Sequence, residues 1–128
     1  MPPLDRLIVF TRFPAAGRTK TRMIPLLGAE GAADLQRAMT EHLLRRLDGD
    51  GPGQGWEVEI RYAGAAAARV RAWLGPGYRL RPQGAGDIGR RMERSLGEAF
   101  AEGWARGAVV GTDIPEITAG LIQEAFAA

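Results

Sequence analysis

The feature that most constrains the fold is a short apolar run that ends in a cationic loop. The run covers residues 7–11, and its β-branched side chains are typical of a buried strand. Pro14 ends it, and a loop containing Gly17 follows. Three cations then stand at alternate positions: Arg18, Lys20 and Arg22. Ligands of open α/β sheets bind at the carboxyl ends of the strands, where cations and backbone N–H groups suit a phosphate. The alternative interpretation is a solvated basic turn.

The rest of the chain alternates between strand and helix patterns. Further strands are expected at 56–62, 78–81 and 108–111. Helices are expected at 29–47, at 65–74, from an N-cap at Asp87 to about Arg106, and from a cap at Thr118. This order predicts an α/β fold with three α/β/α layers and a mainly parallel sheet.

Two of these segments carry detailed expectations. The helix at 29–47 shows one buried stripe at helical spacing, formed by Ala32, Leu35, Ala38, Met39, His42, Leu43 and Leu47. His42, the one histidine, therefore favours a packing role over catalysis. The strand at 56–62 alternates strictly between apolar and polar residues, which predicts one face in water.

Composition indicates an ordinary globular protein. The chain has 128 residues, 45% of them hydrophobic, and a net charge of +2, so we expect one domain over 1–128 and no nucleic-acid partner. Zero cysteines exclude disulfides and thiolate sites. The sequence lacks a membrane-span run and a signal-peptide pattern, which favours a cytoplasmic protein. The apolar helical pattern at the last residues and the small expected sheet suggest the N-terminal portion of a longer domain, or an edge covered in a homo-oligomer.

Other motifs are weaker. Residues 84–89 match the dinucleotide pattern G-x-G-x-x-G, with Asp113 placed 24 residues later. The preceding strand is short and polar, however, and Asp87 would stand where the pyrophosphate sits, so these glycines indicate a turn and a helix entry. Residues 17–21 resemble a P-loop only superficially. Asp113 ends an apolar strand, where a carboxylate suits Mg²⁺ or Mn²⁺ bridging phosphates or, alternatively, caps a turn.

Three segments together resemble one family. Residues 10–22 are similar to the F-x-[KR]-x-P-x-x-G-x-x-K-T-R opening of the DUF2064 proteins. Residues 83–92 resemble their Q-G-x-x-L-G-x-R-M segment, with about one extra residue before Gly89, and residues 111–118 resemble their G-[ST]-D-x-P-x-[LI]-T segment. These proteins are glycosyltransferase-like members of the nucleotide-diphospho-sugar transferase superfamily, which has the GT-A fold.

The resemblance implies a nucleotide-binding α/β domain of the GT-A type whose family members continue for a second half. Its catalytic residues are not identified. Asp113 would occupy the metal position, for Mg²⁺ or Mn²⁺. For Arg91, a phosphate contact and an ion pair with Glu93 or Asp87 both remain open. The residues expected to bind the nucleotide or its phosphates are Thr11, Arg12, Gly17, Lys20, Arg22 and Arg91.

The leading hypothesis is a metal-assisted glycosyltransferase that uses a nucleotide-diphospho-sugar donor and a small-molecule acceptor. One alternative is a nucleotidyltransferase of the same fold, which joins an NTP to a small acceptor and releases pyrophosphate. Another is a nucleotide-binding or assembly subunit without catalysis, completed by a partner chain. Binding of NAD through residues 84–89 is the least favoured alternative.

Overall fold

A computed structural model describes residues 5–17, 24–48 and 56–111. Within them, parallel strands form one sheet in the order β3-β2-β1-β4. In chain order the elements are β1 (Asp5–Arg12), α1 (Ile24–Asp48), β2 (Trp56–Ala63), α2 (Ala67–Leu74), β3 (Arg79–Pro82), α3 (Ile88–Ala101) and β4 (Arg106–Gly111). The expected helix from Thr118 lies outside the described residues.

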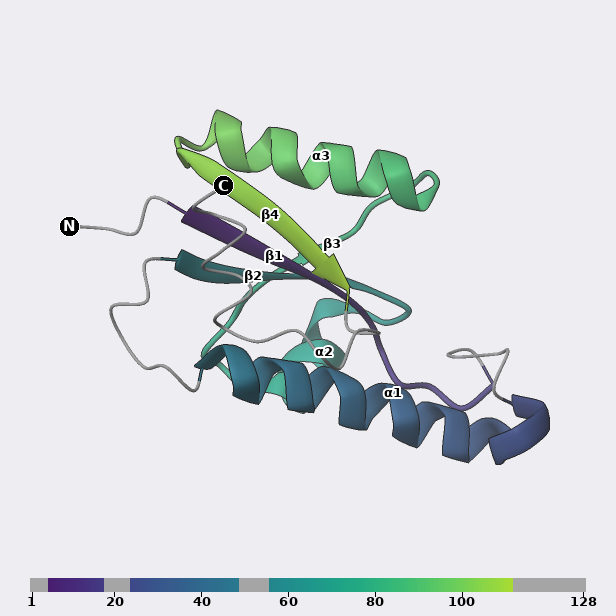
Figure 1. The fold of residues 1–128 in the computed structure, drawn as a ribbon. Coiled ribbons are helices and arrows are strands. Elements are labelled where there is room, and N and C mark those ends of the chain that lie inside the picture. The colour runs from purple at the N-terminus through teal and green to yellow at the C-terminus, as the bar shows by residue number, and fades with distance from the viewer. Residues whose placement is uncertain (1–4, 18–23, 49–55, 112–128) are drawn as a thin grey trace.

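The helices cover both faces of this sheet. Helices α1 and α2 lie on one face and α3 lies on the other (Figure 1). The predicted three-layer arrangement with a parallel sheet is therefore confirmed. The sheet grows from β1 to β3 on one side, and α3 then carries the chain back to β4 on the other side of β1. This reversal is the kind of topological switch point at which open α/β sheets bind ligands.

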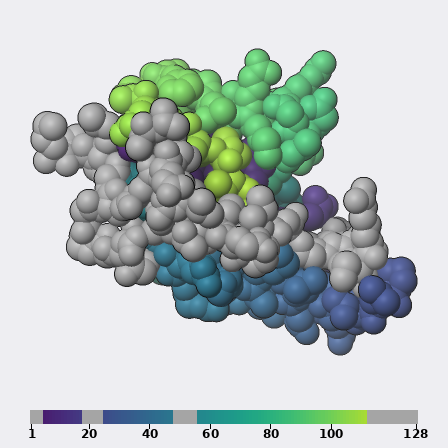
Figure 2. Space-filling view, viewed as in Figure 1, coloured from purple at the N-terminus to yellow at the C-terminus, as the bar shows by residue number. Residues whose placement is uncertain are grey.

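Strand β1 is buried on both faces, and its alternate side chains feed two cores. Leu7 and Val9 pack with Ile60 of β2 and with leucines of α1, including Leu43. On the opposite face, Ile8 and Phe10 pack with Ala99 of α3. Burying each large apolar side chain contributes about 1.5–3 kcal/mol, so β1 anchors both helical layers. Atoms of β4 remain visible between α1 and α3 in Figure 2.

The prediction that the polar face of β2 contacts water is wrong at Glu59 and Arg61, because α3 covers this part of the strand. Glu59 and Arg61 are 1% and 2% exposed. The Nε atom of Arg61 donates to Glu59, and its Nη2 atom donates to Oε2 of Glu98 on α3 at 2.8 Å. Arg79 and Arg81 from β3 lie 3.3 and 3.7 Å from the second carboxylate oxygen of Glu59. At Glu59 and Arg61 the alternation thus marks a buried ionic face, whereas Glu57 near the start of the strand is exposed as predicted.

This ionic layer gives folding a defined pH dependence. The hydrogen bond from Arg61 lowers the pKa of Glu98 below its ordinary value of 4.5. A carboxylate with a lowered pKa in the folded state stabilises it fully above the ordinary value, and this stabilisation is lost as the pH falls through the lowered pKa.

We therefore expect Glu98→Gln to lower the melting temperature at pH 7. The melting temperatures of the variant and of the unmodified protein should converge as the pH falls below 4.5. Thermal unfolding followed by circular dichroism from pH 7 to pH 3 measures this gap. Glu93→Gln, at an exposed position of the same helix, is the control and should show a small gap throughout. A Glu98→Gln gap that stays constant with pH would contradict the assignment.

The buried stripe of α1 differs from the expected one. The helix breaks at Gly28, whose φ is 74°, and its regular part follows this glycine, close to the predicted start at residue 29. Ala32, Leu43 and Leu47 are buried as expected, but Ala38 is exposed and Leu35, Met39 and His42 are half-buried. Gln36 and Thr40 are buried instead, because they pair with the polar end of β1.

Helix α3 starts as predicted and ends early. The Asp87 side chain accepts a hydrogen bond from the backbone N–H of Arg90 at 2.8 Å, so this residue is the N-cap. The helix ends at Ala101 rather than near Arg106. Gly103 adopts a φ of 98°, and Arg106 belongs to β4, where its guanidinium pairs with Asp5 of β1 at 2.7 Å.

Within the described residues, no helix is both long and apolar enough to span a membrane.

Candidate functional site

A cleft lies at the carboxyl edge of the sheet, where β1, β2 and β3 end. It has a volume of about 430 Å³. We call it the carboxyl-edge cleft. The residues that line it include Arg12, Tyr62, Gly64, Pro82, Gln83 and Arg91. Two of the residues expected to bind phosphate, Arg12 and Arg91, therefore share one cleft although they are 79 positions apart in the sequence.

Arg12 reaches the cleft across a glycine. It is the last residue of β1 and is exposed. Gly64, just after β2, has a φ of 89°, and a Cβ atom there would lie 3.2 Å from Cγ of Arg12 and 3.6 Å from the backbone nitrogen of Phe13. The missing side chain of Gly64 thus leaves room for the stem of Arg12.

Arg91 enters from the first turns of α3. Its Nε atom donates to the carbonyl oxygen of Gly86 at 2.8 Å, and its Nη1 atom donates to Oε1 of Gln83 at 3.1 Å. Among the described residues, the structure gives Arg91 no ion pair with Glu93 or Asp87, the alternative partners that the sequence left open. One edge of the guanidinium is thus fixed by neutral oxygens, which leaves its positive charge available to an anion in the cleft.

Gln83 is the residue that sequence reasoning missed as part of the site. It is 7% exposed, and its Nε2 atom donates to the carbonyl oxygens of Thr11 and Arg61 at 3.2 and 3.1 Å. The amide therefore ties the ends of β1 and β2 to Arg91. Its position at the start of the family-like segment 83–92 was the one sequence signal for it.

Thr11 belongs to a buried polar cluster beneath α1. Its Oγ1 atom lies 2.8 Å from Oγ1 of Thr40 and accepts a hydrogen bond from Nε2 of Gln36 at 3.1 Å. The same Nε2 atom donates to the carbonyl oxygen of Arg12 at 2.9 Å. These contacts hold the end of β1 against α1, so the Thr11 hydroxyl supports the cleft from below rather than lining it. The Thr11 carbonyl oxygen accepts the hydrogen bond from Gln83.

Aromatic contacts fix the chain just after Arg12. The Phe13 ring meets the Trp73 ring of α2 edge to face at 5.8 Å, and the Arg69 guanidinium lies 4.5 Å from the centre of the Phe13 ring. Backbone N–H of Phe13 also donates to the carbonyl oxygen of Ala63 at 2.8 Å. Gly17 follows with a φ of 79°, a conformation that suits glycine at a loop turn.

Three expected site residues lie outside the described residues: Lys20, Arg22 and Asp113. Within the described ranges, no group of three or more His, Asp or Glu side chains could hold a metal ion. Asp113 stands two positions after Gly111, which ends β4. Its role as a metal ligand remains a prediction from the sequence.

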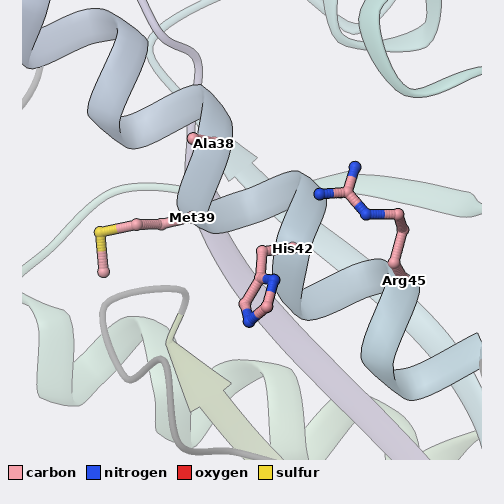
Figure 3. Close-up of a pocket in the computed structure, with 4 residues that line it drawn as sticks. All are labelled: Ala38, Met39, His42 and Arg45. Atoms are coloured by element: carbon pink, nitrogen blue, oxygen red, sulfur yellow. The ribbon is translucent and has the colours of Figure 1, made fainter.

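A second hollow lies beside α1, with a volume of about 310 Å³. Figure 3 shows the residues from the described part of the chain that line it, and these come from α1: Ala38, Met39, His42 and Arg45. The Nε2 atom of His42 accepts a hydrogen bond from Nε of Arg46 at 2.9 Å. His42 is thus half-buried at the helix surface rather than packed in the core, and it lies on a different element from the residues of the carboxyl-edge cleft.

Comparisons with known proteins agree with this fold. The family described as "Uncharacterized protein conserved in bacteria (DUF2064)" matches residues 51–128. A crystal structure described as a "putative nucleotide-diphospho-sugar transferase", from Desulfovibrio desulfuricans G20, superposes with a TM-score of 0.89 at 29% sequence identity. The match covers 98% of this chain and 54% of that one, so this chain spans about half the length of that protein. A search of curated proteins found no significant match.

Proposed function

We propose that this chain binds the diphosphate of a nucleotide-sugar donor for glycosyl transfer. The chain belongs to the DUF2064 family, and it carries two arginines in one cleft. The observation that carries this proposal is the convergence of Arg12 and Arg91 at the carboxyl edge of a parallel sheet. The similarity to the Desulfovibrio structure supports the class of ligand.

In this proposal, cations stabilise the charge that develops on the departing nucleoside diphosphate. Arg91 is already oriented by Gln83 and Gly86, so little reorganisation is needed when negative charge develops nearby. Lys20 and Arg22, which follow β1 in the sequence, would add further positive charge. Asp113 would supply one oxygen ligand to Mg²⁺ or Mn²⁺, which would neutralise the phosphates. The second candidate is transfer of the nucleotidyl group of an NTP to a small acceptor, with pyrophosphate as the leaving group, because the same cations suit a triphosphate.

A thermal-shift panel separates these candidates. It comprises UDP, GDP, CDP, ADP, their common sugar derivatives and the matching NTPs, with EDTA, Mg²⁺ or Mn²⁺. We expect a metal-dependent rise in melting temperature with one diphosphate and its sugar derivative. A shift with NTPs alone would favour nucleotidyl transfer, and NAD serves as the control for the dinucleotide alternative.

The metal assignment has its own test. Asp113→Asn should remove the metal-dependent part of the shift and leave the melting temperature of the free protein unchanged within about 2 °C, because asparagine has nearly the same size and shape as aspartate. The matched control is Asp87→Asn, which conserves the N-cap and lies on another element. Equal metal dependence in Asp113→Asn and the unmodified protein would contradict the assignment.

A further inference from the structure

The loop between β3 and α3 is held by arginines that point back at it from the helix. The Nη1 atom of Arg94 donates to the carbonyl oxygen of Gln83 at 3.0 Å, and its Nη2 atom donates to that of Ala85 at 2.8 Å. Arg91 binds the next carbonyl along the loop, that of Gly86. A planar guanidinium can hold two carbonyl groups at once because its donors form a rigid fork.

Gly84 makes this contact possible. Its φ is 84°, and a Cβ atom at this position would lie 2.2 Å from Nη1 of Arg94. Any side chain at residue 84 would therefore displace the guanidinium. The glycine serves the close approach of Arg94 as well as the turn.

Arg94 acts away from the cleft itself. It is exposed, and it is not among the residues that line the carboxyl-edge cleft. Within the described residues it makes no ion pair with a carboxylate, and both of its terminal nitrogens bind loop carbonyls. A surface arginine that serves only solubility would have no reason for this geometry.

We infer that Arg94 is a positioning residue for the carboxyl-edge cleft. It fixes the backbone of Gln83, and the Gln83 side chain in turn accepts a hydrogen bond from Arg91 and bonds to the ends of β1 and β2. Loss of Arg94 frees the loop, so Arg91 loses the oriented partners that aim its charge. The predicted effect of Arg94 on nucleotide binding rests on the proposed function. Its predicted effect on the orientation of Arg91 does not depend on that function.

The first test needs no ligand. Hydrogen exchange at the arginine Nε–H groups, measured by NMR, reports whether Arg91 keeps its bond to Gly86. In Arg94→Met we expect this exchange at Arg91 to be about tenfold faster, as for the loss of one charge-assisted hydrogen bond. Arg94→Lys should show a similar increase, because an ammonium lacks the fork. Arg90→Met, on the same turn of α3 as Arg91, should leave it unchanged.

The second test uses magnesium pyrophosphate and magnesium UDP, GDP, CDP and ADP as probes in calorimetry. Affinity for the probe that binds should fall about tenfold in Arg94→Met and in Gly84→Ala, and remain unchanged in Arg90→Met. Unchanged exchange at Arg91 in both Arg94 variants would overturn the inference. Faster exchange with no probe bound by the unmodified protein would support the positioning role and count against the proposed function alone.

Discussion

Replacing Arg61 with methionine is expected to lower the free energy of unfolding by about 3 kcal/mol or more, since it leaves buried charge without its main partner. Glu59 is 1% exposed, and Arg61 is the buried cation that joins it to Glu98 of α3, whereas Arg81 bridges the same two carboxylates from a more exposed position. Burial alone would lower the pKa of Arg61, but its hydrogen bonds to Glu59 and Glu98 outweigh burial and raise that pKa. Arg79 and Arg81 remain near Glu59 in the variant, which keeps the loss at the lower end of the range for buried ion pairs.

Urea unfolding followed by circular dichroism measures this loss. Arg79→Met is the matched control, because it removes a half-exposed cation from the rim of the same layer and should cost less than about 1 kcal/mol. The double variant Glu59→Leu/Arg61→Met should recover part of the loss, since it removes both charges together. Equal stability of Arg61→Met and Arg79→Met would show that the ionic layer does not hold α3 to the sheet.

The second large effect concerns ligand binding. Arg91→Met should weaken binding of the nucleoside diphosphate by tenfold or more, the effect of about one charge-assisted contact to a phosphate. The thermal stability of the free protein should fall only slightly, because Arg91 is half-buried and both of its partners are neutral. Calorimetric titration at two salt concentrations measures affinity and its salt dependence.

Arg90→Met is the control for this variant. It removes the same charge from the neighbouring position of α3, where the side chain is exposed and lies 4.0 Å from Asp87. It should bind the nucleotide as tightly as the unmodified protein does. If both variants lose the same affinity, the effect is general electrostatic attraction, and Arg91 has no specific contact with the phosphates.

Local signals in the sequence were sufficient for the order of elements and for the parallel sheet. The apolar run at 7–11 lies inside β1, and Asp87 caps α3, because both depend on neighbouring residues. The family resemblance, which rests on three spaced segments, is confirmed by the match over residues 51–128. Arg12 and Arg91 line the carboxyl-edge cleft, and Thr11 lies beside Arg12 at the end of β1, whereas the binding of a nucleotide by these residues stays a prediction.

The features of the fold and of the site that could not be predicted from the sequence depend on contacts between residues far apart in the chain. Glu59 and Arg61 alternate like a solvated face, and only the packing of α3 makes that face buried. Gln36 and Thr40 interrupt an apolar stripe because Thr11 needs polar partners 25 and 29 positions away. Gln83 joins β1, β2 and α3 through one amide, a role that no local pattern indicates.

The most direct test of the proposed function is calorimetric titration of the protein with a nucleoside diphosphate, its sugar derivative and its triphosphate, each with Mg²⁺ and with EDTA. We predict that the diphosphate and the sugar derivative bind with similar affinity and require the metal, and that Arg91→Met weakens both. The absence of binding for every diphosphate, or metal-independent binding that Arg91→Met does not change, would contradict a nucleotide-sugar site at the carboxyl edge of this sheet.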